Sequence, residues 1–200
     1  KDGDKNYDLF QMAVKTSAQR LFPNFSFLDA PFNLQYYKAG DYNTEVAYMG
    51  CRTRVMGNVH DRTKEVTCGR GNLSFTSINL PRLGIEADGD IQKFYSLLDE
   101  KIDLVIRQLL HRFKIQCTKK VKNYPFLMGQ GIWIDSETLD FDDSVAEVLK
   151  HGTLSIGFIG LAETLKALIG KHHGESEAAG RLGLEIIGHM RKRMDDESAK

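Results

Sequence analysis

Apolar residues recur at helical spacing in several stretches of the chain. The widest stripe runs from residue 91 to 116 and includes Phe94, Leu98 and Ile102. Its period of about 3.6 predicts one long helix, for which Asp90 is the expected N-cap. The same spacing predicts shorter helices over residues 7–22, 142–150, 161–169 and 175–199, with Asp142 or Asp143 capping the second of these.

Strands are expected where apolar and polar residues alternate or where a short apolar run is bounded by turn residues. These patterns predict extended structure over residues 25–28, 73–80, 124–134 and 153–159. Pro81 is expected to end the second strand, before a turn around residues 87–90. Because strands alternate with helices, the sequence predicts an α/β fold with a mainly parallel sheet or barrel.

Residues 38–72 contain many glycines and polar residues and no long periodic pattern. Only residues 46–49 and 54–59 are apolar enough for extended structure. Loops longer than about 12 to 15 residues are uncommon in compact domains and are usually functional or disordered. This segment is therefore a candidate functional loop, and Cys51 lies near its middle.

Composition and charge narrow the function classes. Twenty-seven Lys and Arg balance twenty-seven Asp and Glu, so no summed field attracts nucleic acid or an anionic membrane. No apolar run approaches the roughly 20 residues of a membrane-spanning helix, and the first residues do not resemble a signal peptide. We therefore expect a soluble, cytoplasmic protein without direct nucleic-acid binding. Because Lys1 stands where an initiator Met would be, we expect a piece of a longer protein.

The three cysteines are an odd number and form no CxxC pair, which is a poor framework for disulfides or a structural zinc site. Cys51 follows Gly50 and precedes Arg52, whose charge would favour a thiolate if the two side chains approach. Thiyl-radical chemistry instead requires a sulfur held against a substrate C–H in a cavity that excludes solvent. Taken alone, Cys51 also fits a small buried core thiol, and we interpret Cys68 and Cys117 in that structural way.

A second glycine-rich motif, residues 68–72, ends at Asn72. Its glycines would let the backbone approach a ligand, and the Asn72 amide offers both a donor and an acceptor. The motif lacks the GxxxxGK[ST] pattern of a phosphate-binding loop. On the residues alone, a tight turn that leads into the following strand is the favoured explanation of the motif.

Several stretches, taken together and in order, resemble the catalytic subunit of the oxygen-sensitive, anaerobic ribonucleoside-triphosphate reductases. They are Met49-Gly50-Cys51-Arg52, Gly69-Arg70-Gly71-Asn72-Leu73, Ile78-Asn79-Leu80-Pro81-Arg82, and the run from His151 to Glu163. The resemblance covers about residues 45 to 165 and makes the chain a central segment of such a subunit.

The resemblance implies a ten-stranded α/β barrel of the glycyl-radical enzyme type, in which residues 1–200 form one segment of a larger catalytic domain. Residues 38–72 would be the finger loop, with Cys51 at its tip. In the family this sulfur becomes a thiyl radical and abstracts the ribose 3′ hydrogen, after which the 2′-hydroxyl leaves as water. Asn72 matches a family asparagine near the substrate sugar, and Met49, Gly50 and Gly71 in the same motifs are expected to bind substrate with it.

The same resemblance implies cofactors and partners outside this segment. They are a glycyl radical elsewhere in the full chain, formate as the reductant, a homodimer, and a radical-SAM activating enzyme. The substrate would be a ribonucleoside triphosphate, the pathway deoxyribonucleotide biosynthesis for DNA replication, and ATP a bound nucleotide. The segment itself is expected to hold no metal or cofactor. The family's glycyl-radical motif lies outside these residues, so we expect the chain to be inactive alone.

Two alternatives remain open from the sequence. Another glycyl-radical enzyme, such as a pyruvate formate-lyase-like acyltransferase, also presents a loop cysteine, but it generally uses two adjacent cysteines whereas Cys51 has Gly50 and Arg52 beside it. A non-catalytic α/β binding domain would instead bury Cys51 in its core.

Overall fold

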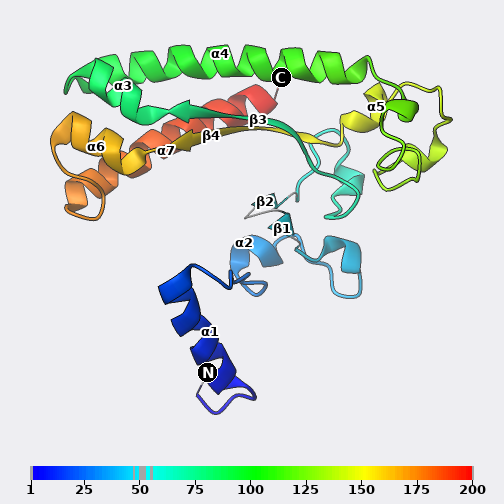
Figure 1. Cartoon of the computed structure of the whole chain (residues 1–200), viewed down its shortest axis with the longest axis horizontal. Helices are drawn as coiled ribbons and strands as arrows, with labels where there is room; N and C mark the ends of the chain where they lie inside the picture. The colour runs from blue at the N-terminus through cyan, green and yellow to red at the C-terminus, as the bar shows by residue number, and fades with distance from the viewer. Residues whose placement is uncertain (1, 47, 50–52, 55, 200) are drawn as a thin grey trace.

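The computed structural model describes residues 2–46, 48, 49, 53, 54 and 56–199 (Figure 1). The helices are α1 (Tyr7–Arg20), α2 (Pro31–Leu34), α3 (Leu80–Ala87), α4 (Ile91–Cys117), α5 (Ala146–Leu149), α6 (Leu161–Ile169) and α7 (Glu177–Ser198). The strands are β1 (Tyr48–Met49), β2 (Thr53–Arg54), β3 (Asn72–Asn79) and β4 (Thr153–Ile159). The predicted mixture of helices and strands is confirmed.

Strands β3 and β4 pair in parallel, and the long helix α4 runs along them (Figure 1). Gln108 and Arg112 of α4 bond to the β3 hydroxyls of Thr76 and Ser74, at 2.9 and 3.1 Å. One face of this two-stranded sheet is therefore covered by a helix, as the alternation of strands and helices predicts. The ten-stranded barrel that the family resemblance implies stays a prediction.

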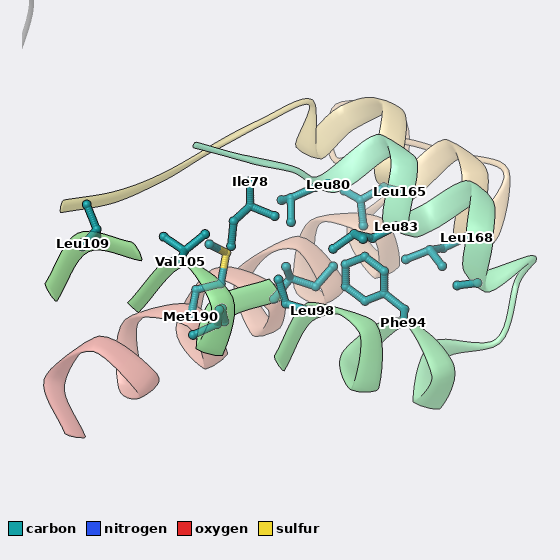
Figure 2. Packing of buried hydrophobic residues seen from close by; sticks show 13 residues of the cluster. Ile78, Leu80, Leu83, Phe94, Leu98, Val105, Leu109, Leu165, Leu168 and Met190 are labelled. Carbon is teal, nitrogen blue, oxygen red and sulfur yellow. The ribbon is translucent and has the colours of Figure 1, made fainter. Parts of the chain in front are cut away.

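The main hydrophobic core lies between these strands and four helices (Figure 2). Its fully buried members include Phe94, Leu98 and Ile102 of α4, which the helical spacing placed on one face. The other buried members are Ile78, Leu80, Leu83, Ala87, Val105, Leu109, Leu165, Leu168, Ile186 and Met190. The partly buried Leu154 and Ile156 of β4 pack against them, so residues from both strands and from α3, α4, α6 and α7 share one core.

Helix α4 begins at the predicted residue because Asp90 caps it. The Asp90 carboxylate accepts a hydrogen bond from the Lys93 backbone N–H at 3.0 Å, which satisfies one of the free donors of the first turn. Helices α6 and α7 also match their predicted ranges closely, and Ser176 caps α7 in the same way by accepting from the Ala179 N–H.

Replacing Asp90 by alanine should lower the free energy of unfolding of the chain by about 1 kcal/mol, because the cap bond is lost. Urea unfolding followed by circular dichroism measures this change. Asp196→Ala provides the matched control, since Asp196 is exposed near the end of α7. An equal loss of stability in both variants would contradict the capping role.

Helix α3 was not predicted. Pro81 was expected to stop the strand before a turn, whereas it lies in the first turn of a helix that starts at Leu80. Proline is favoured there because the first helical N–H groups have no partner within the helix. The side-chain oxygen of Asn79 caps this helix by accepting a hydrogen bond from the Arg82 backbone N–H at 3.2 Å.

Two predicted extended segments are wrong. Residues 25–28 form no strand, and the Phe27 carbonyl instead accepts a bond from the Asn33 side chain at 2.6 Å. Residues 124–134 form turns whose backbone groups bond within the segment, as Met128 does to Tyr124 at 2.9 Å. An apolar run becomes a strand only if another strand pairs with it, and none does so here among the described residues.

Helix α5 is shorter than predicted and starts at Ala146 rather than near residue 142. Neither predicted cap acts as one, because Asp142 pairs with Lys122 and the Asp143 carboxylate accepts from the Asp140 N–H. Helix α1 has its predicted place, but none of its residues is buried in the described structure.

A second hydrophobic cluster packs beneath the turns after α4. Its buried members are Val121, Met128, Trp133, Val145, Val148 and Leu149. The Trp133 indole N–H donates to the Val148 carbonyl at 2.7 Å, which joins the turn segment to α5. Residues 124–134 thus contribute Met128 and Trp133 to this cluster from turns and not from a strand.

Residues 38–72 are largely irregular, as predicted, with short ordered pieces. Besides β1 and β2, they contain the 3-10 turns η1 (Tyr42–Thr44) and η2 (Arg62–Lys64). No helix in the described part of the chain is long and apolar enough to cross a membrane.

Candidate active site

In the sequence, the strands β1 and β2 lie on either side of the predicted radical cysteine. They pair antiparallel with Met49 opposite Thr53, so three residues, 50–52, connect the paired ends. Cys51 is the middle one of these three in the sequence. Gly50 and Cys51 themselves, and the Met49 side chain, lie outside the described residues, so their predicted roles remain predictions.

Asn72 begins β3, directly after the buried Gly71. The Gly71 carbonyl accepts a hydrogen bond from the Thr153 backbone N–H at 3.0 Å, which starts the pairing of the two parallel strands. The strand pair thus begins at the two predicted substrate-binding residues, Gly71 and Asn72.

A β-bulge sets the direction of Asn72. Asn72 pairs with Thr153, but the next pair is Ser74 with Leu154, so Leu73 is an extra residue in β3. Without this residue Asn72 would share the face of Ser74, which bonds to α4. The bulge instead puts Asn72 on the opposite face, with Phe75.

That opposite face is not covered by helices in the described chain. Phe75 is 66% exposed, and Ser77 and Asn79 on the same side are exposed as well. On β4 the same face carries Ser155 and Gly157, where a Cβ on the glycine would lie 3.0 Å from the Ser77 hydroxyl. Beyond Asn72, this sheet face therefore consists of the exposed Phe75 ring and of small and polar residues.

The Asn72 side chain has an unusual hydrogen-bond status. Its Oδ1 atom is shielded from solvent and has no hydrogen-bond partner within the described structure. The same is true of Oε1 of Gln116, whose amide nitrogen donates to the Leu73 carbonyl at 3.1 Å. Buried acceptors without a donor are rare in folded proteins and need an explanation.

Residues 56–70, which follow Cys51 in the chain, are held by a buried polar cluster that the sequence did not reveal. Arg70 donates from Nε to the His151 carbonyl at 3.0 Å, and its two terminal nitrogens bond to the carbonyls of Met56, Gly57 and Val66. The His151 ring contacts Asn58 and Asp135. His151 and Arg70 both lie inside the motifs of the family resemblance, which is the one signal that marked them.

The other two cysteines differ from each other. Cys117 is partly buried at the end of α4, and burial raises the pKa of its thiol, as expected for a structural cysteine. Cys68 is exposed, with its thiol 3.4 Å from the Asn43 side-chain oxygen. The expected packing role of Cys68 is therefore wrong.

Comparison with known proteins gives a consistent result over the whole chain. The sequence model of the family described as anaerobic ribonucleoside-triphosphate reductase matches residues 1–200. The relative of this name from Escherichia coli K12 is 32% identical over 198 residues, and the one from Salmonella typhimurium LT2 is 33% identical over the same length. Each alignment covers 98% of this chain but 26% of the relative.

The relative of the same name from Enterobacteria phage T4 is 29% identical over 177 residues, which is 86% of this chain and 28% of that protein. The chain therefore corresponds to about a quarter of the length of these relatives. Because the family model matches all of its residues, the chain belongs to the anaerobic ribonucleoside-triphosphate reductase family.

Proposed function

We propose that the full-length protein containing this chain reduces ribonucleoside triphosphates to 2′-deoxyribonucleoside triphosphates by anaerobic radical chemistry, and that Cys51 is its hydrogen-abstracting thiol. The observation that carries the proposal is the family match over residues 1–200, which includes the motifs around Cys51 and Asn72. In the sequence, the paired strands β1 and β2 flank residues 50–52.

The chemistry assigned to Cys51 balances as follows. A glycyl radical elsewhere in the full-length protein would supply the oxidising equivalent. Cys51 sulfur takes one hydrogen atom from the ribose 3′ carbon, so the S–H bond forms as the C–H bond breaks. Loss of the 2′-hydroxyl as water consumes one proton, and formate supplies two electrons and one hydrogen for carbon 2′ and leaves as carbon dioxide. The Cys51 S–H then returns its hydrogen to carbon 3′, which restores the sulfur radical.

Asn72 is proposed to orient the ribose. Its amide oxygen has no donor in the described structure, and a ribose hydroxyl is a donor that the substrate would supply. The bulge at Leu73 places Asn72 on the side of the sheet that carries Phe75, away from Ser74, which bonds to α4. Gly71, Gly50 and Met49 would contribute backbone or side-chain contacts from the same two motifs.

The larger assembly is also a proposal. Residues 1–200 would form one segment of a ten-stranded barrel, with residues 38–72 as its finger loop and β3 and β4 as two of its parallel strands. A homodimer and a radical-SAM activating enzyme are the proposed protein partners. The parallel pairing of β3 with β4 and the helix that covers one of their faces support this architecture.

The test is an anaerobic assay of the full-length protein after treatment with a radical-SAM activating enzyme. We expect ribonucleoside triphosphate and labelled formate to give deoxyribonucleoside triphosphate and labelled carbon dioxide in equal amounts. The 200-residue chain alone should give neither product. Pyruvate- and coenzyme A-dependent acyl transfer without nucleotide reduction would favour the pyruvate formate-lyase-like alternative and overturn the proposal.

A further inference from the structure

A polar cluster holds the segment that follows Cys51. His151 is 4% exposed and Asn58 is 2% exposed, and their side chains are 2.9 Å apart, from His151 Nδ1 to Asn58 Nδ2. The other ring nitrogen, Nε2, lies 3.0 Å from the Asp135 carboxylate. Lys64 Nζ contacts both oxygens of this carboxylate at 2.7 Å.

The orientation of the Asn58 amide follows from its backbone contacts. Its nitrogen lies 3.1 Å from the Lys64 carbonyl, which can only accept, and its oxygen lies 3.1 Å from the Asp61 backbone N–H, which can only donate. The group facing His151 is therefore the amide N–H. His151 Nδ1 must accept this hydrogen bond, so the ring is neutral and carries its proton on Nε2, where it donates to Asp135.

The electrostatics of the cluster favour the same state. The Lys64 ammonium holds the pKa of Asp135 below its usual range, so this carboxylate stays ionised. Burial lowers the pKa of His151, an effect that the neighbouring Asp135 opposes. The charged or titratable groups facing the ring are Asp135, Lys64, His60, Asp61 and Arg70, of which Arg70 binds the His151 carbonyl.

The cluster connects the segment that begins at Met56 with the start of β3, where Asn72 lies. On one side, Arg70 donates a hydrogen bond to the Met56 carbonyl. On the other side, Arg70 is two residues before Asn72, and His151 is two residues before Thr153, the strand partner of Asn72. Movement at His151 would therefore shift the paired start of β3 and β4, where Asn72 lies.

We propose that His151 is a positioning residue for the proposed reductase: its neutral, Nε2-protonated ring ties the segment of residues 56–70 to the start of β4, and so fixes the paired start of β3, where Asn72 is proposed to hold the ribose. This inference rests on the proposed function. A proton on Nδ1 would point at the Asn58 N–H, and the hydrogen bond between Asn58 and His151 would be lost. Because a displacement of about 1 Å can cost a reaction about 100-fold in rate, a small movement is enough.

The experiment uses the activated full-length protein and measures kcat and KM between pH 5 and 9. The wild-type kcat should fall at acid pH, as His151 becomes protonated below its lowered pKa. His151→Ala should lower kcat about 100-fold with KM little changed. His151→Gln keeps a donor for Asp135, so it should retain more activity than alanine, and it should lose the acid decline because glutamine does not titrate.

Asp135→Asn gives a second test that keeps the size of the side chain. Removing the negative charge lowers the pKa of His151 further, so the acid decline should move to lower pH. His173→Gln is the control, because His173 is an exposed histidine in the turn after α6. Circular dichroism and the glycyl-radical signal check that each variant is folded and activated.

The outcomes separate this inference from the proposed function. If the wild-type protein reduces no ribonucleotide after activation, the proposed function fails. If the wild type is active but His151→Gln keeps both its full kcat and its acid decline, only the positioning role of His151 is overturned. An acid decline that moves to higher pH in Asp135→Asn would overturn that role as well.

Discussion

Replacing Cys51 by serine in the full-length protein should reduce deoxyribonucleotide formation to the background level. Serine preserves the size and polarity of the side chain, but its O–H bond is much stronger than S–H, so the hydroxyl cannot exchange a hydrogen atom with a carbon radical. Binding should be little affected, because the substitution removes a group that acts in the transition state. Chromatography of the nucleotides from an anaerobic assay measures the loss, and electron paramagnetic resonance shows whether the glycyl radical still forms.

Cys68→Ser is the matched control for this experiment. Cys68 is exposed, and its thiol makes one long contact with Asn43, so its replacement should leave activity unchanged. A glycyl-radical signal of normal size in both variants would show that activation does not depend on either thiol. Activity retained in Cys51→Ser but lost in Cys68→Ser would place the radical thiol at residue 68 and contradict the proposal.

The sequence correctly predicted the helices and strands whose local pattern of apolar, capping and turn residues is sufficient to define them. Helix α4 has a wide apolar stripe and an N-cap in Asp90, and β4 is a short apolar run bounded by glycines, so both lie where they were expected. Residues 25–28 have an equally apolar pattern and form no strand. The difference is the pairing partner, because β4 pairs with β3 and residues 25–28 pair with no described strand. A local sequence pattern does not reveal such long-range pairing.

The candidate site shows the same division between local and long-range information. The motifs marked Cys51 and Asn72 by resemblance, but the direction of Asn72 depends on the bulge at Leu73, which exists only in the register with β4. The His151 cluster joins residues that are far apart in the chain, from Asn58 to Asp135, so spacing could not reveal it. Only the folded chain shows that residues 56–70 are bonded to the residues just before β4, the strand partner of β3.

Replacing Phe94 by alanine should lower the free energy of unfolding by about 3 to 5 kcal/mol. The Phe94 side chain is fully buried, with Leu83 of α3 and Leu168 of α6 in the same cluster (Figure 2). Alanine removes the apolar contacts of the ring and leaves a cavity, since the helices that form this core are closely packed and cannot all move inward. Urea unfolding of the chain, followed by circular dichroism, measures the change.

Phe75→Ala is the control for Phe94→Ala, since Phe75 is largely exposed on the open face of β3 and its loss should change stability by less than about 0.5 kcal/mol. The fluorescence of Trp133, the single tryptophan, reports on the second hydrophobic cluster. If the two clusters unfold as one unit, Phe94→Ala shifts the fluorescence transition as far as the circular dichroism transition. A shift in the circular dichroism transition alone would mean that the second hydrophobic cluster is stable independently of the main core.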